Sequence, residues 1–322
     1  MHGAGNDYVY FDACGSDGRC VIAADASSML QDPASVAVKI ADRHKGVGGD
    51  GIIFVLPSTR ANARMRMFNS DGSEAEMCGN GVRCVAHLVV ARGYANPGTI
   101  TIETGRGVLS LDVEPTGVRS SRVRVDMGEP RLEATDIPVA IGIDGPIVLQ
   151  ETPITTIESW WDAAGFDSRL TCVSMGNPHA IWYCRDSSRV PLDVFGPKVE
   201  RHPAFPRRTN VHVVQVLGPD RVRMRSWERG SGLTQACGTG ASAVCVAGVL
   251  TGHSGSRITA EVPGGELQLE WSGGTVCMTG PAEEVFEGVW PSEAGVRPER
   301  ASSTPGEPGA SKSSGDGMGV RT

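Results

Sequence analysis

The chain has 322 residues, of which 40% are hydrophobic and 21% are charged, and its formal net charge is −7. These values are ordinary for a globular protein, and the length is sufficient for two domains with full cores. The negative net charge, without a basic stripe in the sequence, argues against a nucleic-acid partner. No apolar run approaches the roughly 18 residues that a membrane-spanning helix needs, so we expect no membrane association.

The chain contains nine cysteines, an odd number, and no two of them have CxxC spacing. No signal peptide precedes the first motif. Both features favour a reduced, cytoplasmic protein. Seven of the cysteines are interpreted as small core or surface residues: Cys14, Cys20, Cys84, Cys172, Cys184, Cys245 and Cys277.

Five segments have a clear secondary-structure pattern. Two are helix-length apolar segments, closed by Gly93 and Gly252, and three are strands in which polar and apolar residues alternate. The alternation has one break in step, at Val213-Val214. In chain order the segments are a helix from Val82 to Ala91, a strand from Arg122 to Asp126, a strand from Val211 to Val216, a helix from Ala241 to Leu250 and a strand from Glu266 to Glu270.

The sequence repeats itself around two cysteine motifs. Met77-Cys78-Gly79-Asn80-Gly81 and Ala236-Cys237-Gly238-Thr239-Gly240 are 159 positions apart (237 minus 78). The same shift places Arg64-Met65-Arg66 on Arg223-Met224-Arg225. A shift of 158 then places Ile100-Thr101 on Ile258-Thr259, so a single gap relates the two halves, as expected for a duplicated domain.

The repeat predicts two related halves, each a set of strands around one central helix with a cysteine at the N-terminus of that helix. We place the first half at residues 1–120 and the second at residues 121–290. Residues 291–322 consist mainly of Ser, Gly, Pro and charged residues, and we expect them to be a disordered tail.

Two thiols at equivalent helix starts indicate a specific chemistry. The unpaired N–H groups and partial positive charge of a helix N-terminus favour a thiolate and lower the pKa of a cysteine. The same N–H groups, next to glycines, can hold a carboxylate. A carbanion between two facing thiols can lose a proton to one and gain a proton from the other, which is two-base racemisation or epimerisation of an amino acid. Alternatively, both cysteines are buried helix-start residues beside tight turns.

Six motifs, in order, resemble those of the diaminopimelate epimerase family over roughly Met1 to Trp290. They are His2-Gly3-Ala4-Gly5-Asn6-Asp7, Phe68-Asn69-Ser70-Asp71-Gly72-Ser73-Glu74 leading into Cys78-Gly79-Asn80-Gly81, Met175-Gly176-Asn177-Pro178-His179, Arg208-Thr209-Asn210-Val211, Glu228-Arg229-Gly230, and Thr234-Gln235-Ala236-Cys237-Gly238-Thr239-Gly240. The resemblance implies an α/β fold of two pseudo-symmetric domains, each a barrel-like, mostly antiparallel sheet around a central helix.

The resemblance also implies interconversion of LL- and meso-diaminopimelate without a cofactor or a metal, in lysine and peptidoglycan-precursor synthesis. Cys78 and Cys237 are then the two acid/base residues, and His179 supports their protonation state. The implied substrate-binding residues are Asn6, Asn69, Gly79, Asn80, Asn177, Asn210, Glu228, Arg229, Gly238 and Thr239. Asn69, Asn177, Asn210 and Arg229 hold the distal, non-reacting end, and Glu228 contacts the substrate amine.

Two features depart from the family pattern. Some members have an aromatic residue and Gln where this chain has Gly49 and Gly51, so the contacts of the Gly46 to Gly51 loop stay open. The chain also begins directly at its opening motif, without the residues that usually form a first strand.

Two other functions remain open. One is a related two-cysteine racemase acting on histidine or proline. The other is a non-enzymatic thiol protein, such as a metal binder, but the sequence spacing shows no close Cys/His ligand set. A homodimer is one possible assembly.

Overall fold

The computed structural model describes residues 1–14, 29–151, 154 and 158–290, so the predicted tail lies outside the described residues. Contacts group Met1–Glu287 into one compact unit, and Gly288–Thr322 form a second. All elements described here belong to the first unit.

The first half of the chain contributes nine of the described strands and two helices. They are β1 (His2–Gly3), β2 (Asn6–Asp7), β3 (Val9–Asp12), α2 (Pro33–Ala41), β4 (Gly51–Leu56), β5 (Ala63–Asn69), β6 (Glu74–Ala75), α3 (Gly79–Ala91), β7 (Gly98–Thr104), β8 (Gly107–Gly117) and β9 (Ser120–Asp126).

The second half contributes the remaining elements of the described chain. They are α4 (Trp161–Ala164), β10 (Thr171–Ser174), β11 (Pro178–Cys184), the 3-10 helix η1 (Ser187–Arg189), α5 (Leu192–Glu200), β12 (Asn210–Gly218), β13 (Arg221–Glu228), β14 (Gly232–Thr234), α6 (Gly238–Thr251), β15 (Arg257–Val262), β16 (Gly265–Glu270) and β17 (Cys277–Glu283).

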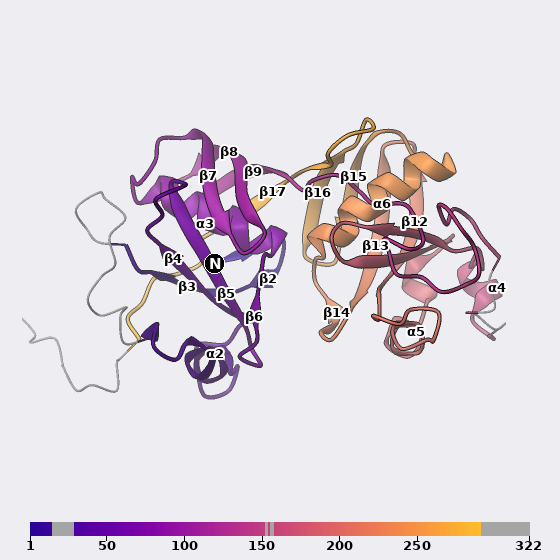
Figure 1. Ribbon diagram of the computed structural model, residues 1–322, viewed down its shortest axis with the longest axis horizontal. Coiled ribbons are helices and arrows are strands. Elements are labelled where there is room, and N and C mark those ends of the chain that lie inside the picture. The colour runs from indigo at the N-terminus through magenta and orange to yellow at the C-terminus, as the bar shows by residue number, and fades with distance from the viewer. Residues whose placement is uncertain (15–28, 152–153, 155–157, 291–322) are drawn as a thin grey trace, which may run out of the picture. The chain divides into compact units, whose positions relative to one another are not determined.

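The same strand pairings occur in both halves. β3 pairs in parallel with β4, β4 antiparallel with β5, β5 in parallel with β7, and β7 antiparallel with β8. β11, β12, β13, β15 and β16 repeat this series of parallel and antiparallel pairs. Within each half one helix packs along the strands, α3 beside β7, β8 and β9, and α6 beside β12, β15 and β16 (Figure 1). The duplicated motifs therefore belong to a duplicated arrangement of strands and helices.

Strand β17 joins the two halves. Its first residues pair with β16, and its whole length pairs antiparallel with β9. All the described strands thus form one continuous sheet with mostly antiparallel pairs, which is open rather than a closed barrel. The predicted fold class, mixed α/β with a central helix in each half, is confirmed. The division into domains at residue 120 stays a prediction; β9, which starts there, pairs with both β8 and β17.

Both predicted central helices are present and start three residues earlier than predicted. Cys78 is the N-cap of α3 and Cys237 is the N-cap of α6, each with an extended backbone. Gly252 ends α6 as its C-cap with φ 72°, a left-handed conformation that favours glycine. The helix following each motif therefore places its cysteine at the N-terminus, as the repeat predicts.

The three predicted strands are also confirmed, as parts of β9, β12 and β16. The break in the alternation of β12 has a physical cause, since residues 211–214 are all buried. Val211 and Val213 belong to one hydrophobic cluster, and Val214 belongs to another. A strand that is covered on both faces does not need polar residues at alternate positions.

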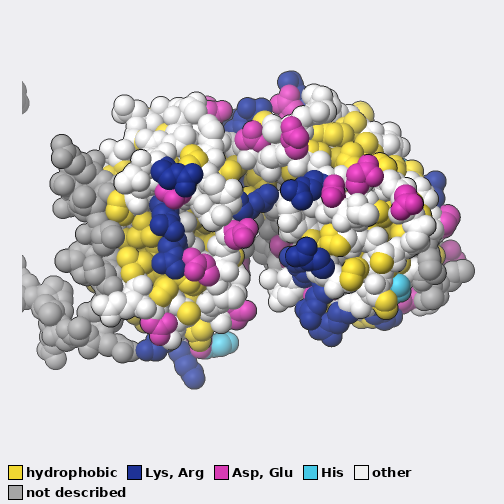
Figure 2. Space-filling model, viewed as in Figure 1, with side chains coloured by type: hydrophobic (Ala, Val, Ile, Leu, Met, Phe, Trp, Pro, Cys, Tyr) yellow, Lys and Arg dark blue, Asp and Glu magenta, His cyan; other side chains and the backbone are white. Residues whose placement is uncertain are grey.

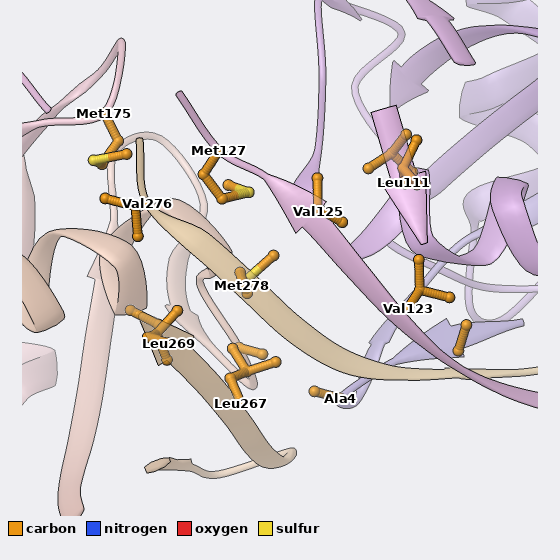
Figure 3. Packing of buried hydrophobic residues seen from close by; sticks show 14 of the residues in the cluster. Ala4, Leu111, Val123, Val125, Met127, Met175, Leu267, Leu269, Val276 and Met278 are labelled. Atoms are coloured by element: carbon orange, nitrogen blue, oxygen red, sulfur yellow. The ribbon is translucent and has the colours of Figure 1, made fainter. Parts of the chain in front are cut away.

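One hydrophobic cluster of the unit contains residues from both α3 and α6 and from the β9–β17 junction. Figure 3 shows Met127, Met175, Val276 and Met278 of this cluster close together at the junction. A Cβ atom added to Gly79 would lie 3.1 Å from the Met278 methyl carbon, and one added to Gly238 would lie 3.2 Å from it. Met278 therefore contacts the first residues of both central helices.

Charged side chains of both signs lie side by side on the face of the molecule in Figure 2. Ion pairs of the strands include Arg66 with Glu74 and Arg223 with Glu261. None of the helices in the described part of the chain combines the length and apolar character that a membrane crossing requires.

Met278→Ala should destabilise the protein by about 2–5 kcal/mol, because it leaves a cavity where the side chain is fully buried between two helix starts. Urea unfolding measures this change. Val118→Ala is the matched control: Val118 is 95% exposed, and its truncation should change the free energy of unfolding by less than about 0.5 kcal/mol. Equal effects of the two substitutions would contradict the packing role of Met278.

Candidate active site

Cys78 lies in a cluster of amide groups from two separate elements. Its Sγ atom is 3.4 Å from Asn6 Oδ1 on β2, and Gly81 N–H donates to Sγ over 3.4 Å. The Asn6 amide in turn donates to Asp50 over 2.5 Å. Asn6 on β2 lies just before β3, and Asp50 lies just before β4, so the parallel pairing of β3 with β4 brings both residues beside the start of α3.

Cys237 lies at the equivalent position, with different neighbours. Its Sγ atom is 3.7 Å from Thr239 Oγ1, and Asn177 Nδ2 donates to the same hydroxyl oxygen over 3.3 Å. Glu228, the last residue of β13, accepts a hydrogen bond of 2.6 Å from Thr234. The second site thus combines a thiol, a carboxylate and a row of neutral polar groups.

Asn80 links the two cysteine sites. Its side-chain amide donates to the carbonyl of Ala236, the residue before Cys237, over 3.0 Å, and to Asn6 Oδ1 over 3.4 Å. Its Oδ1 atom is buried without a hydrogen-bond partner among the described residues. The first N–H groups of α3 and α6 also lack intrahelical partners, as at any helix start. Backbone donors without intrahelical partners and one unpartnered acceptor therefore lie close together where the two helices begin.

The pKa values of both thiols are raised, whereas the sequence predicts that the helix starts lower them. Burial raises the pKa of Cys78 to about 11, and it raises the pKa of Cys237 well above its ordinary value. Backbone N–H groups of Gly81 and Gly240 act in the opposite direction. The expectation of lowered pKa values is wrong, because desolvation of the thiolate outweighs the donors of the helix start.

Glu228 acts on both cysteines. Its negative charge contributes to the raised pKa of Cys78 and to that of Cys237. Burial raises the pKa of Glu228 itself, and the charge of Asp50 adds to this effect. Two thiols and two carboxyl groups therefore interact in one region, where Asp50 is also paired with Arg43.

A chain of hydrogen bonds leads from the interior of the second half to Cys237. Ser226 Oγ is 2.9 Å from His212 Nδ1, His212 Nε2 is 2.9 Å from His179 Nδ1, and His179 Nε2 is 3.0 Å from Asn177 Oδ1. Burial lowers the pKa of both histidines, that of His212 to about 3, so both are neutral. Since Asn177 Oδ1 accepts, we assign His179 Nε2 and His212 Nε2 as donors and Ser226 as the donor to His212. The chain continues through Thr239 to the Cys237 thiol.

Three of the predicted site residues form hydrogen bonds with groups other than the two cysteine motifs. Asn69 donates to Ser73 Oγ, and no hydrogen bond links it to the cysteine motifs in the described part of the chain. Asn210 donates to the Pro178 carbonyl over 2.8 Å and accepts from the Arg229 backbone N–H over 3.0 Å. The Arg229 guanidinium is exposed and donates to the Arg207 carbonyl over 3.0 Å. The structure thus brings Asn6, Asn80, Asn177, His179, Glu228 and Thr239 to the cysteines, whereas Asn210 positions the backbone around Arg229.

Four residues near the cysteines were not identified from the sequence. Asp50 lies in the loop whose contacts were left open, and His212 is one of the alternating residues of a predicted strand. No sequence pattern indicated a role for Ser226. Arg83 is fully buried on α3, where it donates to the carbonyls of Gly79 and Pro281, and its positive charge partly offsets the rise in the pKa of Cys78.

A Cys/His set that spacing did not show is present in the fold. His179, His212 and Cys237 are buried, and one ligand atom from each lies within 4.8 Å of the others. Sequence spacing could not reveal this set, because strand pairing brings together residues that are far apart in sequence. Free thiols are found at Cys78, Cys84, Cys172, Cys184, Cys237, Cys245 and Cys277. Cys14 differs from these, since it is disulfide-bonded.

Glu228→Gln should lower the pKa of Cys78, because it removes a negative charge that disfavours the thiolate. The pH midpoint for alkylation of Cys78 by iodoacetamide, measured in a Cys237→Ser background, should move to lower pH by about 0.5–1 unit, about 0.7–1.4 kcal/mol. Gln keeps the shape and can still accept from Thr234.

Glu74→Gln in the same background is the control. Glu74 is an exposed carboxylate paired with Arg66, and it is not among the groups that act on Cys78. Its substitution should leave the midpoint in place. A midpoint that stays fixed or rises in Glu228→Gln would contradict the electrostatic role of Glu228.

The sequence is similar to a described family over most of its length. The model of the family "Diaminopimelate epimerase" matches residues 1–133 and 171–285. A diaminopimelate epimerase of Pelotomaculum thermopropionicum is 46% identical over 291 residues, covering 90% of this chain and 97% of that protein. One of Methanococcus maripaludis is 45% identical over 290 residues, covering 89% and 97%.

Solved structures with low sequence identity share the fold. A phenazine biosynthesis protein of the PhzF family from Bacillus anthracis has a TM-score of 0.56 at 14% identity, covering 88% of this chain and 95% of that chain. A hydroxyproline epimerase from Agrobacterium vitis has a TM-score of 0.55 at 15% identity, covering 88% and 87%. These likenesses concern the fold alone, whereas the family match and the high identity to curated relatives concern the sequence itself. The chain belongs to the diaminopimelate epimerase family.

Proposed function

We propose that this protein interconverts LL- and meso-diaminopimelate by a two-base mechanism that needs no cofactor. The observation that carries the proposal is the pair of cysteines at the N-caps of two equivalent helices, with Asn80 of one helix bonded to Ala236 beside the other cysteine. The family membership supports the same reaction. Lysine and peptidoglycan-precursor synthesis are the processes that this activity would serve, and the cytoplasm is the expected location.

The reaction requires one thiolate and one thiol. The thiolate removes the proton of the reacting α-carbon, and the electron pair of that C–H bond moves toward the carboxylate carbon. The other thiol donates its proton to the opposite face of the carbanion, which reforms a C–H bond with inverted configuration. After one turnover the protonation states of Cys78 and Cys237 are exchanged, so the pair titrates as a coupled unit.

The helix starts stabilise the intermediate. Charge develops on the substrate carboxylate as the proton leaves, and preorganised N–H donors are most effective there. The N–H groups of Gly79, Asn80, Gly238 and Thr239 are the proposed donors, and glycines at both helix starts leave the approach open. The buried, unpartnered Oδ1 of Asn80 is an additional acceptor in this region.

Glu228 couples substrate binding to the formation of a thiolate. Its charge contributes to the raised pKa values of both cysteines. A substrate ammonium group that pairs with Glu228 offsets this charge and favours formation of a thiolate. The thiolate that acts as the base therefore forms when the substrate binds. His179 is hydrogen-bonded to Asn177, which is bonded to Thr239, and this chain helps to determine which of these groups donates a proton to Cys237.

The distal end of the substrate is proposed to contact Arg229 with Asn69, Asn177 and Asn210. The backbone of Arg229 is held by Asn210, while its guanidinium is exposed and able to meet a carboxylate in a bidentate geometry. The alternative of a proline- or histidine-specific racemase has less support, since the likeness to a hydroxyproline epimerase is at 15% identity. The non-enzymatic alternative does not account for the paired helix starts.

Cys78→Ser and Cys237→Ser should each abolish epimerisation, because each substitution removes one of the two acid/base groups. The assay follows conversion of LL-diaminopimelate in deuterium oxide, and the wild-type product should carry deuterium at the inverted α-carbon. Full activity of either variant, or a need for added pyridoxal phosphate, would contradict the mechanism. Cys277→Ser is the control, since its half-buried thiol lies on β17 and has no proposed role.

Arg229→Lys should lower kcat/KM by about one to two decades, or roughly 1.5–3 kcal/mol, because Lys keeps the charge but loses the planar bidentate fork. Arg207→Lys is the matched control: it retains the backbone carbonyl that Arg229 contacts and should have near wild-type kinetics. Normal turnover by Arg229→Lys, or a wild-type preference for proline or histidine, would show that the assignment of the distal end is wrong.

A further inference from the structure

Three buried ligand atoms converge beside one of the two helix starts. His179 is on β11, His212 is on the neighbouring parallel strand β12, and Cys237 is the N-cap of α6. His179 pairs with Asn210, two residues before His212, so both imidazoles project from the same face of the sheet. One ring nitrogen of each histidine and the thiol sulfur lie within 4.8 Å of one another.

The other ring nitrogens are already held by oxygen atoms. His179 Nε2 is bonded to Asn177 Oδ1 at 3.0 Å, and His212 Nδ1 is bonded to Ser226 Oγ at 2.9 Å. The two remaining nitrogens, His179 Nδ1 and His212 Nε2, face each other at 2.9 Å. In metal sites a ligating histidine almost always presents its second nitrogen to such an oxygen, which fixes the orientation of the ring.

A glycine makes the convergence possible. A Cβ atom added to Gly240 would lie 2.3 Å from His212 Cε1 and 3.0 Å from Cys237 Sγ, so any larger residue would displace the imidazole or the thiol. Among the described residues Cys78 belongs to no such set, and its hydrogen-bond partners are Asn6 Oδ1 and the backbone N–H groups of Asn80 and Gly81. The two sites therefore differ in their ability to hold a metal ion.

We propose that His179, His212 and Cys237 bind a thiophilic divalent cation, such as Zn²⁺, with a fourth coordination position open to water. Two imidazoles and one thiolate form a donor set that suits zinc in tetrahedral geometry. The ion exchanges three bound waters for the three protein ligands. The Cys237 S–H bond breaks and its proton passes to solvent, while the His212 proton moves from Nε2 to Nδ1 and is donated to Ser226 Oγ. No atom is oxidised or reduced.

The consequence for activity depends on the proposed function. A metal-bound thiolate cannot serve as the second acid/base group, so Zn²⁺ should inhibit epimerisation and a chelator should restore it. Metal binding itself is independent of the reaction. It can therefore be tested by a signal that does not require turnover.

Titration with Co²⁺ provides this signal. The reduced wild-type protein should develop a near-ultraviolet thiolate-to-cobalt charge-transfer band that saturates at one ion per chain, and Zn²⁺ should displace it. Cys78→Ser is the matched control and should retain the band, while Cys237→Ser should lose it. A band that survives in Cys237→Ser, disappears equally in Cys78→Ser, or never forms would overturn the proposal.

Two further variants test the histidine side of the site. His212→Gln should abolish saturable binding, and circular dichroism establishes whether that variant is folded. Ser226→Ala retains all three ligands and removes only the oxygen behind His212, so it should weaken Zn²⁺ binding by about 10- to 100-fold. Unchanged affinity in Ser226→Ala would contradict the assigned orientation of His212.

The two proposals fail in distinguishable ways. A cobalt band without epimerase activity would refute the proposed function and leave the metal site intact. Epimerase activity without a band, and without inhibition by Zn²⁺, would refute the metal site alone.

Discussion

The site depends on the burial of two helix N-termini against one shared strand. Met278 of β17 contacts Gly79 and Gly238, which follow the two cysteines. Since β17 also pairs with β9 along its whole length and with β16, the strand that joins the halves sets the position of both thiols. Glycine at these positions gives the Met278 methyl carbon room, because a side chain at either one would have to displace it by a few tenths of an ångström.

The same burial disfavours the thiolate that the proposed mechanism requires. Desolvation raises the pKa values of both thiols, and Glu228 raises them further. The helix N–H groups and the buried Arg83 act in the opposite direction on Cys78 without outweighing burial. A substrate that carries both an ammonium and a carboxylate group compensates for this: the ammonium offsets Glu228, and the carboxylate uses the N–H groups. Reactive thiolate is then favoured only in the presence of substrate.

The sequence predicts the fold class and the central pair of cysteines because both depend on local and repeated features. The helix after each motif, its terminal glycine and the alternating strands are visible in the order of residues. The repeat adds the expectation that Cys78 and Cys237 are equivalent, and the repeated strand pairings support it. The domain division and the roles of individual binding residues, such as Asn69 and Arg229, stay predictions, because they depend on more than the local and repeated features of the sequence.

What the sequence could not show depends on strand register. His179 and His212 are 33 positions apart, and only the parallel pairing of β11 with β12 places them on one face. Their polar surroundings differ from those of Cys78 even though the helix starts are equivalent. The duplicated fold thus supplies two similar thiols, and later differences in the flanking strands give each thiol its own proton environment. In the proposed mechanism this asymmetry gives the two acid/base groups different proton environments, and the proposed metal ion distinguishes the same two thiols for the same structural reason.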